Sequence, residues 1–120
     1  MNAAERSALG RRGEQLACDF LTARGQTVLD RNWRGGHREL DLVTLDREGL
    51  HFVEVKDRSA ADFLEGSVDG RKQRNMVAAA RQYLAAHPAL RQTDAFFDVI
   101  LIVDGQQPDY YPQAFIPLYL

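Results

Sequence analysis

The sequence predicts an α/β fold in a single domain, with elements in the order α-β-β-β-α-β and a mixed sheet flanked by helices. Two segments carry apolar residues at the period of about 3.6 that is typical of amphipathic helices. Three short segments read as β-strands, and a fourth is apolar almost throughout, as in a strand covered on both faces. The 120 residues are enough to bury one core.

The first helix is predicted over residues 3–24, where Gly25 is expected to end it. Its apolar stripe comprises Leu9, Gly13, Leu16, Ala17, Phe20 and Leu21. At about 100° per residue, Glu14 falls on the edge of this stripe, beside Leu21. Glu14 could therefore reach the rim of the surface on which the helix packs.

Three strands are expected to follow this helix. The first is predicted at residues 27–33, before a turn at 34–36. The second (39–45) and the third (50–56) should form a hairpin around a turn whose Gly49 suits a positive φ. Residues 57–70 are expected to be a mobile loop.

A second amphipathic helix is predicted over residues 71–87, with Pro88 ending it. Its inward residues are predicted to be Met76, Ala80, Tyr83 and Leu84. The apolar strand 95–103 follows, and because a helix crosses between them it should run parallel to the third strand. The core thus spans about residues 3–103, and the C-terminal extension 104–120 holds one weak strand or arm.

Composition limits the functions that the chain can have. Its formal charge of −2 gives no overall attraction to nucleic acid, so such binding would need a local basic patch. The arginines that could form this patch are Arg11, Arg12, Arg31, Arg34, Arg71, Arg74 and Arg81, and a solvated, salt-bridged face is the alternative. The single cysteine, Cys18, excludes an intramolecular disulfide. No apolar stretch approaches the ~20 residues of a membrane span, so we expect a cytoplasmic protein with no membrane partner.

Four charged residues share one face of the predicted hairpin. Side chains alternate along a strand, so Glu39 and Asp41 lie on one face of the second strand, and Glu54 and Lys56 on one face of the third. With a four-residue turn, Asp41 lies opposite Glu54 and Glu39 opposite Lys56. Glu39 is therefore expected to be an ion-pair partner and not a ligand.

The Asp41–Glu54 pair is unfavourable unless a cation lies between the carboxylates or one of them is protonated. Oxygen ligands of this kind favour Mg²⁺ or Mn²⁺. Such a set suits hydrolysis of a phosphodiester, in which carboxylates hold the metal and a lysine such as Lys56 orients the water or stabilises developing charge. A solvated strand end with ordinary salt bridges is the alternative.

Six segments together resemble the YraN family of small bacterial proteins and cover about residues 10–103. They are "GEQLACDFL" (13–21), "RNWR" (31–34), "ELDLV" (39–43), "FVEVKDR" (52–58), "RKQRNMVAAARQYL" (71–84) and "FDVILI" (97–102). That family is similar in fold to Holliday junction resolvases and to the PD-(D/E)XK nuclease superfamily. The resemblance therefore implies a restriction-endonuclease-like core.

The resemblance also implies a role for each matching residue. Asp41, Glu54 and the backbone carbonyl of Val55 would bind the metal, and Glu14 would complete the site. Lys56 would be the catalytic lysine. The implied protein is a Mg²⁺- or Mn²⁺-dependent endonuclease acting on branched or structured DNA, in resolvase-like members as a homodimer. The alternative is a nucleic-acid-binding or protein-interaction module without turnover, and a third interpretation is a metal with a structural role only.

Three further residues stand out from the pattern. Lys72 and Gln73 open the second helix and could touch a substrate phosphate, although an exposed helix start is the simpler interpretation. Asp98 is unusual within an apolar strand, where structural pairing or a strand-end cap is favoured over a ligand role. The histidines, His37, His51 and His87, show no metal-ligand spacing.

Overall fold

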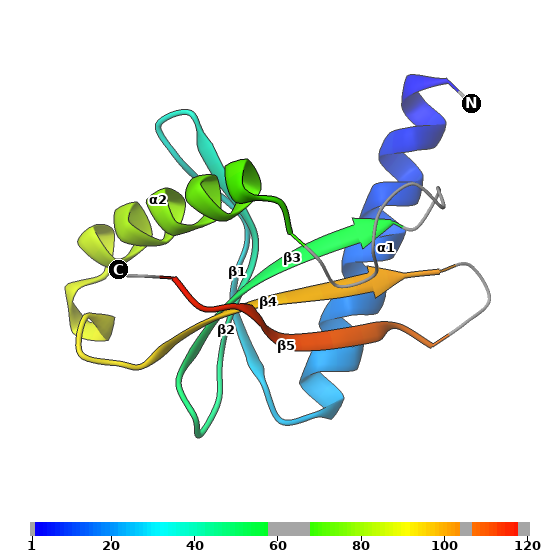
Figure 1. Ribbon diagram of the computed structural model, residues 1–120. Coiled ribbons are helices and arrows are strands. Elements are labelled where there is room, and N and C mark those ends of the chain that lie inside the picture. Colours follow the sequence, from blue (N-terminus) through cyan, green and yellow to red (C-terminus); the bar gives the residue numbers. More distant parts are fainter. Residues whose placement is uncertain (1, 58–67, 104–106, 118–120) are drawn as a thin grey trace.

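A five-stranded sheet lies between two helices in the computed structural model (Figure 1). The structure describes residues 2–57, 68–103 and 107–117, without the side chains of residues 5–9 and 57. The elements are α1 (Ala3–Ala23), β1 (Thr27–Gly35), β2 (Arg38–Leu45), β3 (Leu50–Asp57), α2 (Gly70–Ala86), a 3₁₀ helix (Pro88–Leu90), β4 (Ala95–Ile102) and β5 (Asp109–Phe115). The predicted α/β class and the α-β-β-β-α-β order are confirmed. None of the helices in the described ranges is long and apolar enough to cross a membrane.

The strands stand in the sheet in chain order, β1-β2-β3-β4-β5. Strands β3 and β4 are parallel, and the other neighbours are antiparallel. The parallel pair follows from α2, which carries the chain from the end of β3 back to the start of β4. The predicted mixed sheet is therefore confirmed. The weak strand or arm expected in the C-terminal extension is β5, which pairs with β4 and covers its outer edge.

Each helix covers one face of the sheet with its own core. The core under α1 consists of Ala17, Cys18, Leu21, Leu42, Val53, Ile100 and Ile102. The larger core under α2 contains most of the aromatic residues, including Phe52, Tyr83 and Phe97. Because side chains alternate along a strand, Leu42 lies in the first core and Val43 in the second. Strand β4 supplies both cores and is buried from residue 97 to 102, as predicted for a strand covered on both faces.

The apolar stripe of α1 is narrower than predicted. Ala17 and Leu21, one turn apart, are fully buried against the sheet, but Leu16 is 49% exposed. Leu16 lies about 100° around the helix from Ala17, which places it beyond the contact with the sheet. Leu9, the first residue of the predicted stripe, lies outside the described side chains.

Helix α2 begins and ends close to the predicted residues. The side chain of Asp69 caps its start by accepting a hydrogen bond from the backbone N of Lys72 at 2.8 Å. Its buried residues are Met76, Ala79, Ala80 and Tyr83, so Ala79 takes the place predicted for Leu84, which packs at the edge of the core. Residues 58–67 of the predicted loop lie outside the described residues.

The β2–β3 turn has the predicted register. Leu45 pairs with Leu50, and the backbone N of Asp46 donates to the carbonyl of Gly49 at 3.0 Å. Gly49 has a φ of 151°, and a Cβ built on it would lie 2.4 Å from the carbonyl oxygen of Asp94. Glycine is needed here because the chain before β4 passes against its backbone.

Candidate functional site

The charged end of the hairpin lies where the ladder between β2 and β3 stops. The paired residues run from Leu45–Leu50 to Leu42–Val53, and Asp41 and Glu54 come directly after them. Lys72 on α2 contacts Glu54, and its charge also acts on Asp41, so both carboxylates lie near that helix. The Oδ2 atom of Asp41 accepts a hydrogen bond from the backbone N of Val55 at 2.9 Å. This contact holds Asp41 against the strand that carries Glu54.

The electrostatics of this pair match the like-charge contact predicted from the register. Burial, and next the charge of Glu54, raise the pKa of Asp41 to about 7. The hydrogen bond from Val55 and the charge of Lys72 act in the opposite direction. A divalent cation would remove the repulsion between the two carboxylates and so favour the charged form of both.

Lys72 brings a positive charge to the two carboxylates. Its Nζ atom lies 3.0 Å from Oε1 of Glu54, and its side chain is 44% exposed. Burial lowers the pKa of Lys72, but the charges of Glu54 and Asp41 outweigh it and raise the pKa above its ordinary value. Lys72 is thus part of the site and not merely an exposed helix start.

Gln73, the second residue predicted to touch substrate, has a structural partner. Its Nε2 atom donates to the carbonyl of Val68 at 2.7 Å, which fixes the chain that enters α2. A substrate contact by Gln73 stays a prediction.

Glu14 lies on α1, the helix that covers the opposite face of the sheet. Its Oε2 atom accepts a hydrogen bond from Nδ2 of Asn32 at 2.7 Å. Among the described residues, no group of three or more His, Cys, Asp or Glu side chains could hold a metal ion. The structure therefore brings Asp41, Glu54 and Lys72 together, and the role of Glu14 as a further ligand stays a prediction.

Glu39 has an ion-pair partner that the hairpin register did not indicate. Its Oε2 atom lies 3.7 Å from Nη2 of Arg34, the residue opposite it on β1. The β2–β3 ladder ends before it would place Glu39 opposite Lys56. Lys56 itself is half-buried, follows Glu54 on the same face of β3 and lies in register with Leu101 of β4.

A second polar cluster lies nearer the β2–β3 turn, and the sequence indicated only one of its members. Asp98 is fully buried and accepts hydrogen bonds from the Tyr110 hydroxyl and from the backbone N of Gln113. Its Oδ2 atom also lies 2.7 Å from Nδ1 of His51, whose Nε2 atom lies 3.0 Å from Oδ1 of Asp46. The predicted structural pairing of Asp98 is confirmed. The position of Asp98 within an apolar strand indicated that its carboxylate must have a partner. It could not indicate His51 as that partner, because His51 is 47 residues away in the sequence.

The stability of the protein should fall as the pH rises through the folded-state pKa of His51. Burial alone would lower the pKa of His51, but the hydrogen bonds and charges of Asp98 and Asp46 raise it above the ordinary 6.5. The folded state then binds the proton more tightly than the unfolded state. The stabilisation is fully present below about pH 6.5 and is lost above the folded-state pKa.

Urea unfolding at a series of pH values measures this effect, with two variants for comparison. His51→Gln should make the decline shallower and leave the part that comes from the raised pKa of Asp41. His37→Gln, which changes an exposed turn residue, should keep the full decline of the parent. Equal slopes for the parent and His51→Gln above about pH 6.5 would contradict the assignment.

Most of the chain is similar in sequence to one family of proteins. The model of the family described as "Uncharacterised protein family UPF0102" matches residues 13–102. A UPF0102 protein of Chlorobium phaeobacteroides (strain BS1) is 44% identical over 98 residues, which cover 79% of this chain and 76% of the relative. A UPF0102 protein of Anaeromyxobacter dehalogenans (strain 2CP-C) is 43% identical over 115 residues, 92% of this chain and 85% of the relative. One from Dechloromonas aromatica (strain RCB) is 40% identical over 111 residues, 91% and 89% of the two chains.

Proposed function

The chain belongs to the UPF0102 family, and from the geometry of the Asp41–Glu54 site we propose that it is a metal-dependent endonuclease that hydrolyses DNA phosphodiester bonds. Membership confirms the resemblance to the YraN family, because UPF0102 is that family. Membership of this family does not itself imply the activity, which we propose mainly from one observation. Two carboxylates share a half-buried position beside a lysine, where one divalent cation would neutralise their repulsion.

The donor atoms fit a hard divalent ion. Asp41 and Glu54 offer carboxylate oxygens, and the backbone carbonyl of Val55 is the third donor that the motif implies. A purely oxygen donor set suits Mg²⁺ or Mn²⁺. To complete it, Glu14 would have to leave Asn32 and reach the ion from α1, which covers the opposite face of the sheet. When bound, such an ion acts as a Lewis acid toward the phosphate and lowers the pKa of a water.

Two lysines would act on the water and the phosphate. Lys56 follows Glu54 on the same face of β3, so its ammonium would orient the attacking water or stabilise negative charge that develops on the phosphate. Lys72 pairs with Glu54 at 3.0 Å. Once the charge of Glu54 is neutralised by a cation, the ammonium of Lys72 would be available to a substrate phosphate.

A nucleic-acid-binding or protein-interaction module without turnover is the second candidate function. The hydrogen bond between Glu14 and Asn32 favours this module. With Glu14 held by Asn32, the site has two carboxylates in place of three. In that case a metal would serve only to relieve the repulsion between Asp41 and Glu54. The two candidates differ in whether the bound DNA is cut.

Asp41→Asn should abolish both the stabilisation by metal and the cleavage of DNA. In the parent, Mg²⁺ or Mn²⁺ at 100 times its Kd should add about 2.7 kcal/mol to the free energy of unfolding. For a domain of this size, that raises Tm by roughly 10 °C. Without metal, the variant should be at least as stable as the parent, because it loses the repulsion from Glu54.

Thermal shift and gel assays with flap, junction and single-stranded DNA measure these effects. Asp109→Asn, which makes the same change at an exposed site on β5, should behave as the parent. If the metal ion still raises the Tm of Asp41→Asn, the proposed metal site is wrong. Binding of DNA by the parent without cleavage would support the module. Sedimentation of the same samples tests the homodimer that the resemblance implies.

A further inference from the structure

A groove runs along α2 between that helix and the end of β5. It consists of two adjoining cavities of about 570 and 610 Å³, which share Arg81, Ile116 and Pro117 in their linings. Figure 1 shows the red end of β5 running beside α2. We call these two cavities together the α2 groove.

The lining of the α2 groove is strongly basic, although the protein carries a formal charge of −2. Among the described residues that line it, the charged ones are Arg38, Arg74, Arg81 and Arg91, with Asp94 as the single acidic residue. The four arginine side chains are exposed. Arg74 and Arg81 lie two turns apart on one face of α2, about 10.5 Å along its axis. A row of guanidinium groups along an open groove suits a chain of phosphates.

Apolar side chains lie between these arginines. Ile116 is 79% exposed, the most exposed large apolar side chain in the described part of the protein. Val77 and Ala78 line the same groove on the helix side, and Phe115 lines it on the strand side. A double helix hides its bases and offers mainly phosphates to such a surface. Unpaired bases, in contrast, can pack on apolar side chains while their phosphates meet arginines.

Arg38 links the α2 groove to the neighbourhood of the Asp41–Glu54 site. This residue lines the groove and also a third cavity of about 400 Å³, which it shares with Glu39 and Lys72. Lys72 in turn contacts Glu54 at 3.0 Å. A strand lying in the groove would therefore reach the two carboxylates past Arg38 and Lys72.

We propose that the α2 groove binds a single-stranded stretch of DNA and leads it to the Asp41–Glu54 site. This inference rests on the proposed function and names the form of the substrate next to the bond that is cut. The groove holds the strand by arginine–phosphate contacts, and the apolar lining packs against its bases. Junctions and flaps that contain unpaired nucleotides are then the preferred substrates.

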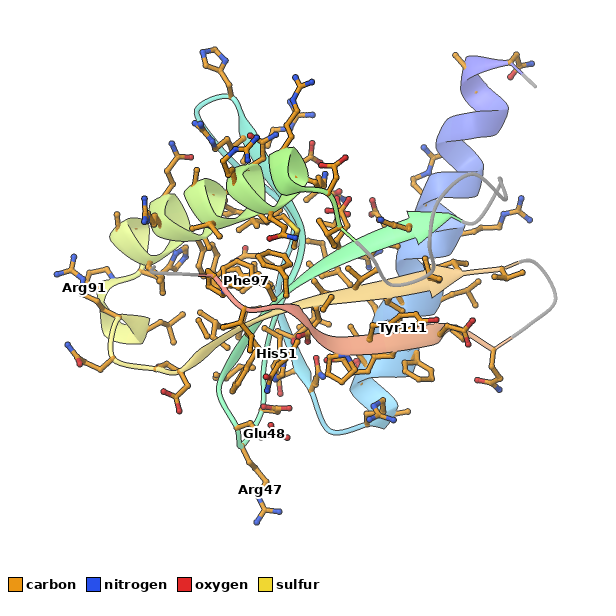
Figure 2. The ribbon with its side chains drawn as sticks, in the orientation of Figure 1. Arg47, Glu48, His51, Arg91, Phe97 and Tyr111 are labelled. Carbon is orange, nitrogen blue, oxygen red and sulfur yellow. The ribbon has the colours of Figure 1, made fainter. Side chains whose placement is uncertain are left out.

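Fluorescence anisotropy with a labelled oligothymidine of about 20 nucleotides tests the groove, with a chelator present so that no metal contributes. Arg74→Glu should weaken binding about 10-fold and make the dependence of log Kd on log salt concentration shallower by about 0.7 for each phosphate that is no longer neutralised. This variant should fold, because Arg74 is exposed and glutamate is a good helix former. Arg47→Glu makes the same charge change at the tip of the β2–β3 turn, as Figure 2 shows, and should leave the Kd within about twofold.

Ile116→Ser tests the apolar lining separately. It should weaken binding of the oligothymidine at every salt concentration without changing the salt dependence, because it removes no charge. Equal losses in Arg74→Glu and Arg47→Glu would overturn the proposal, as would tighter binding of a duplex of the same length. A parent dimer that Arg74→Glu turns into a monomer would assign the groove to contacts between copies and would also overturn it.

Hydrolysis of a small phosphodiester shows whether the groove or the proposed catalytic site is at fault if DNA cleavage fails. Bis(p-nitrophenyl) phosphate is too short to need the groove, so its hydrolysis with Mn²⁺ reports on the Asp41–Glu54 site alone. Hydrolysis of this compound without binding of the oligonucleotide would overturn the groove and retain the enzyme. Oligonucleotide binding that is lost in Arg74→Glu, without hydrolysis of either compound, would retain the groove and overturn the enzyme.

Discussion

Asp98→Ala should lower the free energy of unfolding by about 3–5 kcal/mol, the usual cost of removing one partner from a buried charged network. Asp98 is fully buried and is hydrogen-bonded to three residues on two neighbouring strands, His51 on β3 and Tyr110 and Gln113 on β5. Its removal leaves the His51 ring and the Tyr110 hydroxyl without their buried acceptor. Urea unfolding near pH 6, where His51 is protonated, measures the loss.

A matched variant shows whether the loss comes from burial. Asp109→Ala removes the same group from an exposed position on β5 and should change stability by no more than about 0.5 kcal/mol. Asp98→Asn keeps the size of the side chain and can still accept hydrogen bonds, so its loss should be smaller than that of Asp98→Ala. A cost below about 1 kcal/mol for Asp98→Ala would show that the network contributes little.

Lys56→Ala should lower the rate of DNA cleavage by about 10²- to 10³-fold, the usual effect of removing one group that stabilises charge in the transition state. Lys56 comes two residues after Glu54, the proposed metal ligand on β3, next to the position where a phosphate would be held. The carboxylates of Asp41 and Glu54 remain, so stabilisation by Mg²⁺ or Mn²⁺ should be retained. Single-turnover cleavage, together with the thermal shift, measures both effects.

Lys56→Arg distinguishes the position of the charge from the charge itself. Arginine keeps the positive charge but presents it on a longer, planar group, so DNA binding should be retained while cleavage stays reduced. Arg47→Ala, which removes a cation from the far turn, should cleave as the parent. A Lys56→Ala variant that cleaves DNA at the parent rate would contradict the catalytic role. Loss of the metal shift in Lys56→Ala would indicate a structural role for the lysine.

The fold followed closely from local sequence patterns. Apolar alternation in β2 and β3, with Gly49 in the turn between them, was enough to predict the hairpin and the pairing of Leu45 with Leu50. The crossover helix was enough to predict that β3 and β4 are parallel. The sequence pattern of β5 is weak, because it contains Pro112 and a polar face. The strand forms because the edge of β4 offers backbone N–H and C=O groups with which it can pair.

The candidate site could be predicted only in part. Alternation along the hairpin predicted that Asp41 and Glu54 share a face, and burial together with the charge of Glu54 raises the pKa of Asp41. The pattern could not predict that the two strands part after Leu42 and Val53. Divergence depends on how the sheet twists between two helices, which no short segment encodes.

The sequence by itself determined the order of the elements, the parity of the strand residues and the motif that identifies the family, because each depends on residues close together in the chain. Only the tertiary structure decided that Lys72 contacts Glu54, that His51 lies between Asp46 and Asp98, and that Glu14 binds Asn32. These contacts join different elements of the fold. Their partners are set by the way the helices and the sheet pack into layers. Hydrophobic periodicity specifies which face of an element is buried but not which polar side chain it will meet.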